Sequence, residues 1–335
     1  MRALTGLPPQ AGIGLAIALL VCTVVVDIAS GPAGLPLRAV LVALSGAGEA
    51  TDRFIVVQFR LPVALMAVVV GACLGLAGAT MQTVLDNPLA SPFTMGLAAA
   101  AGVGASVAML FGGPASGLFG TAAGAAIACL IASGLIYTLG RARGMGQAVM
   151  TLTGITLMFF FQSIQALLQY SASQESLQRI VHWLFGDLQR ATWPGVAMVA
   201  IVFLFGLKHL MLDAWRLTAL RLGDARAQAL GVPVASLRQK ALAVVSLLTA
   251  AAVCLVGTIA FIGLVAPHIA RGVVGEDHRL LLPMSAICGA ALLSAGSVLA
   301  KSIIPGIVLP ISVVTALIGV PFLLFLLLRG DHSGT

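Results

Sequence analysis

The feature that most constrains this chain is a succession of apolar runs, most of them about twenty residues long, separated by short polar segments. Of its 335 residues, 60% are hydrophobic and only 9% are charged, whereas a soluble domain carries about 25% charged residues. A helix needs about 20 apolar residues to cross the hydrocarbon core of a bilayer. A water-facing surface cannot be built from this composition, so the sequence predicts a multi-pass membrane protein embedded in a lipid bilayer.

The apolar runs predict helices rather than barrel strands. In lipid, backbone groups must be bonded within the protein, which leaves helices and closed barrels. Barrel strands alternate in polarity over about ten residues, and these runs are longer and do not alternate. We therefore expect an all-α bundle of ten transmembrane helices that forms one domain over residues 1–335. The expected spans are 11–30, 61–83, 93–113, 115–139, 147–170, 194–211, 240–258, 261–274, 281–299 and 307–328.

The distribution of Lys and Arg predicts which side of the membrane each loop faces. Ten crossings place both termini on one side. The loops on that side hold twelve of the 18 cations: Arg2, Arg141, Arg143, Lys208, Arg216, Arg221, Arg226, Arg238, Lys240, Arg271, Arg279 and Arg329. The other loops hold Arg38, Arg53, Arg60, Arg179, Arg190 and Lys301. Cytoplasmic loops are enriched in Lys and Arg, so both termini are expected in the cytoplasm. The same rule accounts for the net charge of +7 without a nucleic-acid partner.

Motifs for catalysis and nucleotide binding are absent from the sequence. A Walker A loop (GxxxxGK[ST]), HExxH and GxSxG do not occur. The five cysteines lie inside apolar runs and form no CxxC pair, which excludes the usual zinc and disulfide frameworks. We expect no catalytic residue, no metal site and no cofactor bound by this chain, and therefore a transport subunit rather than an enzyme.

Charged residues are almost absent from the expected spans. Ion-coupled carriers bury such residues because a charge in the membrane is costly and is retained for function. Here Asp27 lies near the outer end of the first span, and His268 is the one ionisable group well inside an apolar segment. This favours a conduit driven by a separate ATPase. An ion-coupled secondary transporter is the alternative from a different class.

The long cytoplasmic loop at about 212–239 contains a short helix pattern, GDARAQALGV. Asp224 is suited to an N-cap position, and Gly231, with Pro233 shortly after it, is suited to ending the helix. We expect a docking element for the ATPase here, with a solvated amphipathic linker as the alternative.

The segment FIGLVAPHIARGVVGEDHR, residues 261–279, begins apolar and ends charged. Proline lacks a backbone donor and clashes with the preceding turn. We therefore expect Pro267 and His268 to interrupt the helix and to place irregular backbone beside the coupling loop, with Arg271 in the cytoplasmic zone. No carboxylate or thiol accompanies His268, so a hydrogen-bonded structural role is expected rather than metal ligation.

Two further patterns bear on packing and on the transport path. Gly71 and Gly75 form a GxxxG step, which lets helix backbones approach closely in lipid. Gln162, Gln165 and Gln169 recur at three and four residues and form one polar stripe on a helix. Such a stripe faces either a wet cavity or another helix, and both alternatives stay open.

Four stretches resemble the FecCD/BtuC-type permeases of ABC importers for iron–siderophores, haem and cobalamin. They are FRLPVALMAVVVGACLGLAGATMQTVLDNPLASPFTMG from 59, LGDARAQALGV from 222, GTIAFIGLVAPHIARGVVGEDHRLLLP from 257 and LPISVVTALIGVPFLLFLL from 309. The resemblance implies a ten-helix permease in the bacterial inner membrane, paired with a second copy or a paralogue. It also implies two ATP-binding subunits, which hold ATP and Mg, and a periplasmic or lipid-anchored binding protein. Ferric siderophores are the expected cargo, with cobalamin or haem as alternatives.

The resemblance also implies roles for individual residues. Asn87 and Leu89 would close the cytoplasmic mouth, and Arg60 and Lys301 would be exposed cations that dock the binding protein outside. Two residues usual for that docking are replaced, by Val63 and by the Ala295-Gly296 pair. The residues expected to couple the permease to the ATPase are Gly223, Asp224, Arg226, Ala227, Leu230, Gly231, Pro267, His268 and Arg271. Gln162, Gln165 and Gln169 would line the path.

Overall fold

The protein is described by a computed structural model that covers residues 8–31, 34–112, 117–304 and 306–330. Across these ranges all regular structure is helical, and ten apolar helices match the ten expected spans. They are α1 (Pro9–Ala29), α4 (Leu61–Val84), α5 (Leu97–Phe111), α6 (Gly117–Ala142), α7 (Gln147–Ser171), α9 (Trp193–Leu212), α12 (Val234–Val256), α13 (Ile262–Val274), α14 (His278–Ser302) and α15 (Ile311–Gly330). Arg2, which was counted among the cytoplasmic cations, lies outside the described residues.

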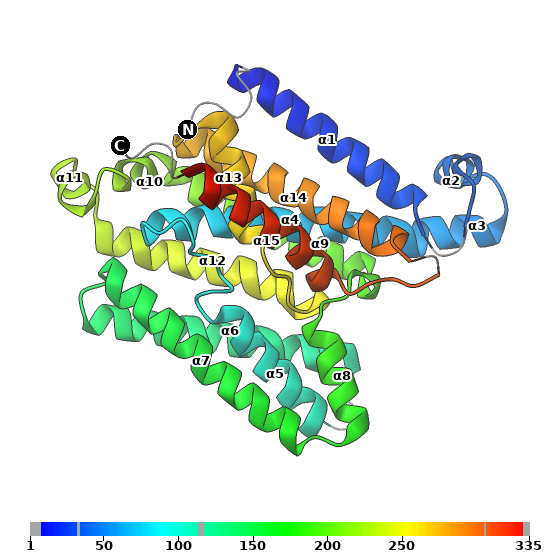
Figure 1. Cartoon of the computed structure of the whole chain (residues 1–335), viewed down its shortest axis with the longest axis horizontal. Helices are drawn as coiled ribbons and strands as arrows, with labels where there is room; N and C mark the ends of the chain where they lie inside the picture. The colour runs from blue at the N-terminus through cyan, green and yellow to red at the C-terminus, as the bar shows by residue number, and fades with distance from the viewer. Residues whose placement is uncertain (1–7, 32–33, 113–116, 305, 331–335) are drawn as a thin grey trace.

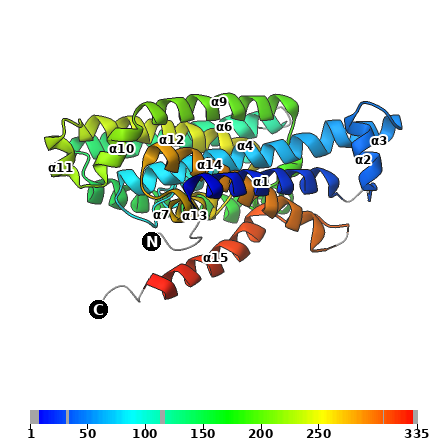
Figure 2. The same ribbon diagram turned by 90° about the horizontal axis from the view of Figure 1, so that it is seen from above.

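Short helices at the two ends of the bundle were not expected from the sequence, apart from α11. One end carries α2 (Leu37–Leu44), α3 (Ala50–Phe54) and the π-helical turn η1 (Ile55–Arg60), which runs into α4. The connection from α7 to α9 holds α8 (Gln174–Leu184) and η3 (Leu188–Arg190). The opposite end carries α10 (Ala214–Leu220) and α11 (Asp224–Ala229). Figures 1 and 2 show that α1 begins and α15 ends at the α11 end, as ten crossings require, and the charge distribution makes this the cytoplasmic end.

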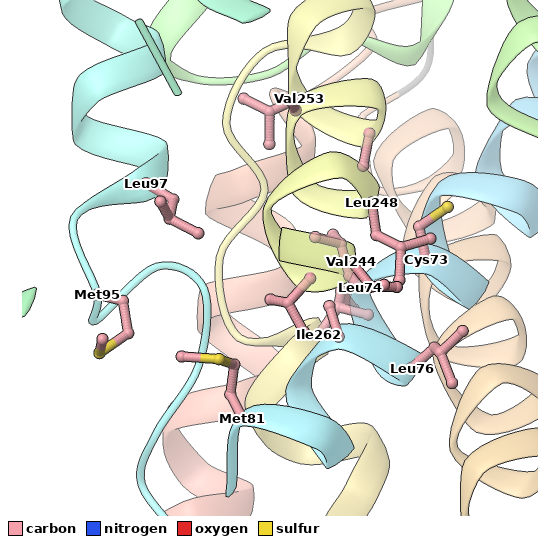
Figure 3. Packing of buried hydrophobic residues seen from close by; sticks show 14 of the residues in the cluster. Cys73, Leu74, Leu76, Met81, Met95, Leu97, Val244, Leu248, Val253 and Ile262 are labelled. Carbon is pink, nitrogen blue, oxygen red and sulfur yellow. The ribbon is translucent and has the colours of Figure 1, made fainter. Parts of the chain in front are cut away.

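Helix α4 forms the centre of the bundle. It packs against α14, α12, α13, α9 and α1. In its most apolar stretch 78% of residues are buried inside the protein, against 17% for α1, so α4 meets protein on all sides while this chain covers little of α1. Figure 3 shows Leu74 of α4 beside Val244 and Leu248 of α12, with Leu76 on another side of the same helix. The hydrophobic core therefore surrounds a helix whose two ends reach both faces of the membrane.

Glycines allow α4 and α14 to approach at backbone distance. A Cβ atom built on Gly71 would lie 2.4 Å from the carbonyl oxygen of Gly289, and one built on Gly289 would lie 2.2 Å from the carbonyl oxygen of Gly71. Gly75 faces the carbonyl oxygen of Ser285 in the same way, at 2.1 Å. The GxxxG step of α4 is therefore a helix–helix contact, because only residues without a Cβ fit there.

The predicted break at Pro267 and His268 is wrong, because α13 runs without interruption from Ile262 to Val274. The irregular backbone lies earlier, between α12 and α13, where Gly257 has φ 80° and Phe261 has φ 66°. Pro267 cannot donate to the carbonyl of Gly263 four residues before it. That carbonyl instead packs on Gly78 of α4, where a Cβ would lie only 1.7 Å from the oxygen. The freed acceptor is therefore covered by a neighbouring helix, which is how proline is tolerated in membrane helices.

Replacing Gly71 by alanine is expected to destabilise the protein, because the new methyl group would meet backbone that cannot rotate away. Overpacking of this kind costs about 1–3 kcal/mol. Thermal unfolding in detergent should show a lower midpoint for Gly71→Ala. The matched control is Gly134→Ala, since a Cβ at Gly134 of α6 meets no atom within 4 Å. Equal midpoints for the two variants would contradict the close α4–α14 contact.

Candidate coupling region, gate and path

Helix α11 is delimited by glycines in left-handed backbone. Gly223 precedes it with φ 93° and Gly231 follows it with φ 80°. At its C-terminus the amide of Val232 donates to the carbonyl of Ala227, and the amide of Gly231 donates to that of Gln228. These two bonds form a Schellman motif, which requires a residue with positive φ. The predicted stop at Gly231 is confirmed.

The predicted N-cap role of Asp224 is wrong. The cap position is occupied by Gly223, and Asp224 is the first residue of the helix. Its carboxylate faces Arg238 of α12, with Nη1 and Nη2 donating to the two oxygens at 2.8 Å each. The side chain therefore ties α11 to the bundle, because an ion pair with a buried arginine is available to it.

One face of α11 rests on the protein and the other is exposed. Ala227 is fully buried, whereas Arg226 is exposed, as are Leu222 and Leu230 on the flanking turns. Leu222 and Leu230 are therefore available to contact a partner chain. The buried position of Ala227 means that a larger side chain there would displace α11 itself, rather than collide directly with a partner.

Arg238 was overlooked as a site residue in the sequence, where it counts only as a cytoplasmic cation. Its side chain is 2% exposed. Besides Asp224, it binds two carbonyls from distant segments: Nε donates to Val84 at 3.1 Å and Nη1 to Met145 at 3.2 Å. Its basic character and its place in the second turn of α12 are no signal of this role, because its partners lie up to 154 residues away.

A second cluster joins α10 and α13 to the segment after α4. Glu276 pairs with Nε of both Arg221 and Arg271, at 3.5 and 3.3 Å, and Arg221 also binds Asp86 at 2.9 Å. Arg271 also donates to Oε1 of Gln82. Arg271 is thus placed beside α10 and α4, as expected of a residue near the coupling loop. The cluster connects three elements at the cytoplasmic end.

Two histidines at this end have hydrogen-bonded structural roles. Nδ1 of His268 bonds the carbonyl of Leu264 at 2.8 Å, which confirms the expected role. His278, which the sequence analysis did not single out, is fully buried with its ring nitrogens 2.6 Å from Oγ1 of Thr83 and 3.2 Å from Oγ1 of Thr218. Over the described residues, no group of three or more His, Cys, Asp or Glu side chains is placed to hold a metal ion.

The segment 85–96 between α4 and α5 carries the two predicted gate residues. Oδ1 of Asn87 accepts a hydrogen bond from the amide of Leu89 at 2.9 Å, which fixes a tight turn. The amide of Asn87 donates to the carbonyl of Gln82 in the last turns of α4. Leu89 is 59% exposed at the cytoplasmic end. The turn thus holds one apolar side chain away from the bundle.

A cavity of about 190 Å³ between α5 and α7 has a mostly apolar lining that includes a few polar side chains. Gln162 and Gln165 belong to its wall, together with Met158, Phe93 and Thr258. Gln165 is also held by Ser106 of α5, through bonds of 2.8 and 3.1 Å. The third residue of the stripe, Gln169, is half-buried and is not part of this wall. Within the stripe, Gln162 and Gln165 border a cavity, and Gln165 also bonds the neighbouring helix α5.

The two cations expected to be exposed at the outer end are buried. Nη1 of Arg60 donates to the carbonyls of Ile28 and Ala29 at 3.2 and 2.8 Å, and so caps the C-terminus of α1. Nζ of Lys301 lies 2.7 Å from Asp27, with side-chain exposures of 4% and 0%. The expectation of exposed charge at these positions is wrong, because each cation satisfies a buried acceptor of α1. Their docking role stays a prediction.

Comparison with known proteins matches this geometry to one family. A model of the FecCD transport family matches residues 19–329. The hemin transport system permease protein HmuU of Yersinia pestis is 36% identical over 275 residues, which cover 81% of this chain and 82% of that protein. The cobalamin import system permease protein BtuC of Halobacterium salinarum is 35% identical over 308 residues, covering 90% and 81%. A solved inward-facing structure of a metal-chelate type ABC transporter has a TM-score of 0.85 at 30% identity and covers 96% of this chain and 99% of that one.

The buried Asp27–Lys301 pair at the outer end predicts that removing one partner destabilises the protein more than replacing both. Lys301→Ala should leave Asp27 charged and unpaired inside the protein, which costs about 3–5 kcal/mol. Replacing both residues, as Asp27→Leu with Lys301→Met, should recover most of that loss, because no buried charge then remains. Thermal unfolding of the three proteins in detergent measures this. If Lys301→Ala were as stable as the parent, the Asp27–Lys301 pair would not contribute to stability as a buried ion pair.

Proposed function

We propose that this chain, which belongs to the FecCD transport family and is the membrane permease of an ABC importer, carries a ferric siderophore across the bacterial cytoplasmic membrane. The observation that carries the importer assignment is the family match over residues 19–329. The two relatives described above are named for cobalamin and hemin, and the solved structure for a metal chelate. All three names point to a large metal-containing chelate as the class of cargo. The siderophore branch rests on two stretches, ASPFTMG at 90–96 and WLFGDLQRATWP at 183–194, which look most like the ferric-siderophore members of the family.

The energy for transport comes from a pair of separate ATP-binding subunits that hold ATP and Mg. The sequence has no Walker A loop of its own. Helix α11 is the element that docks them, since Arg226, Leu222 and Leu230 are exposed at the cytoplasmic end. Gly223 and Gly231, both with positive φ, mark the two ends of this helix.

The pathway lies between two permeases, either two copies of this chain or this chain and a paralogue. The Leu89 side chain of each permease would close the cytoplasmic mouth, and the turn at Asn87 would hold it in place. The cavity lined by Gln162 and Gln165 supplies amide groups beside apolar walls. Such a lining suits a bulky chelate that must pass without being held tightly. A binding protein, periplasmic or lipid-anchored, delivers the cargo at the α2 end.

The cargo is tested by uptake into proteoliposomes that contain the permease, its ATP-binding subunit and its binding protein. We expect ATP-dependent accumulation of a ferric hydroxamate siderophore, and little uptake of haemin or cyanocobalamin. Preferential uptake of either of the latter would replace the siderophore assignment and keep the importer. Uphill uptake by the permease alone, driven by a proton or sodium gradient, would instead establish a secondary transporter.

Leu89→Ala is expected to make the same proteoliposomes leak trapped siderophore without ATP, because the side chain that closes the mouth is shortened. The fold should be unaffected, since Leu89 is exposed. Leu204→Ala is the matched control, as Leu204 is equally exposed, at 61%, on α9. Release of trapped siderophore with time is the measurement. Vesicles of Leu89→Ala that stay as tight as the control would remove Leu89 from the gate.

A further inference from the structure

We propose that Arg238 is the positioning residue that transmits movement of α11 to the cytoplasmic end of α4, and so to the gate segment 85–96. It would touch neither cargo nor nucleotide and would act through the groups that it joins. The inference rests on the proposed roles of α11 as the docking element and of Leu89 as the gate.

The guanidinium group of Arg238 is a junction of four chain segments. Its Nη1 and Nη2 atoms donate to the two carboxylate oxygens of Asp224, the first residue of α11, at 2.8 Å each. Its Nε donates to the carbonyl of Val84, the last residue of α4. Nη1 also donates to the carbonyl of Met145, in the turn that leads into α7. Arg238 itself is part of α12, so α4, α11, α12 and the turn before α7 share one side chain.

The contact with Val84 leads directly to the gate. The last carbonyls of a helix have no partner within it, and Arg238 supplies one for α4. In the same last turns, the carbonyl of Gln82 accepts the amide of Asn87, and Asn87 in turn holds Leu89. A displacement of Asp224 is therefore passed to Leu89 through a continuous series of covalent and hydrogen bonds.

The contact with Met145 extends the junction toward the path. Met145 is almost completely buried and has a positive φ of 55°, so the turn that holds it is tightly constrained. Helix α7 begins two residues later at Gln147 and carries Gln162 and Gln165 on the wall of the cavity. The same guanidinium group thus holds the base of the path-lining helix.

The two ion pairs that join the cytoplasmic elements to the end of α4 and the gate segment differ in the burial of the arginine and in geometry. The alternative route, from Arg221 of α10 to Asp86, has side chains that are 32% and 54% exposed. Exposed ion pairs contribute little, because water screens them and both side chains are free to move. Arg238 is 2% exposed and its partner Asp224 is 41% exposed, and the pair forms a forked, charge-assisted contact, which is stronger and fixes orientation. A lysine cannot reproduce that fork.

The test uses the full importer in proteoliposomes, with a spin label at Leu89→Cys in a background where exposed Cys22 is replaced. The distance between the labels of two copies is measured with and without a non-hydrolysable ATP analogue. Uptake per ATP hydrolysed is measured in parallel on unlabelled proteins that keep Leu89. We expect the nucleotide-dependent distance change to disappear in Arg238→Lys and to shrink in Asp224→Asn. ATP hydrolysis should persist, while uptake per ATP falls about fivefold or more, the range of typical coupling effects.

Arg221→Lys is the matched control, since it makes the same substitution at the exposed pair, and it should respond to nucleotide as the parent does. A label distance that still follows nucleotide in Arg238→Lys would overturn the inference. If that variant fails to assemble, Asp224→Asn decides, because its carboxylate is 41% exposed and the substitution keeps its shape; a full response there would overturn the inference as well. A parent complex whose labels ignore nucleotide would overturn the proposed gate, and this inference with it.

Discussion

The backbone contact between α4 and its neighbours is the constraint on which the rest of the structure depends. In a bilayer the lipid tails are as apolar as the side chains, so helices gain little from hydrophobic burial and associate through close packing. Gly71 and Gly75 of α4 provide that packing against α14, and Gly78 provides it against the carbonyl of Gly263 in α13. Because α4 is covered on all sides, α12, α13 and α14 are held around it as one rigid centre.

The ends of α4 connect this centre to both faces of the membrane. At the outer end, Arg60 immediately precedes α4 and binds the last carbonyls of α1. At the cytoplasmic end, Val84 binds Arg238, and the chain continues into the segment with Asn87 and Leu89. The helix that is packed most tightly into the core is therefore linked through Arg238 to the proposed docking helix α11 and continues directly into the gate segment 85–96. Motion at one end must involve its buried polar contacts.

Charges inside this protein serve mainly to hold helices together. Asp27 and Lys301 join α1 to α14 across 274 residues of sequence, and Ser297 donates to the same carboxylate oxygen. Arg238 and Arg60 bind backbone carbonyls at helix ends, which would otherwise be left without partners. A buried charge is costly unless it is paired and hydrogen-bonded. These pairings explain how the few charged residues of so apolar a chain are tolerated inside it.

The sequence by itself determined the ten helices, the sides of the loops, the stop of α11 at Gly231 and the family. Each of these follows from local patterns: run length, charge between runs, and a glycine where positive φ is required. Only the tertiary structure decided that Pro267 stays within α13, that Arg60 and Lys301 are buried, and that Asp224 pairs with Arg238 rather than capping α11. Most of these outcomes depend on partners far away in the chain. Asp224 and Arg238 are closer in sequence, but Arg238 also binds carbonyls at the end of α4 and in the turn before α7. Hydropathy and residue spacing do not specify which groups the folded helices bring together.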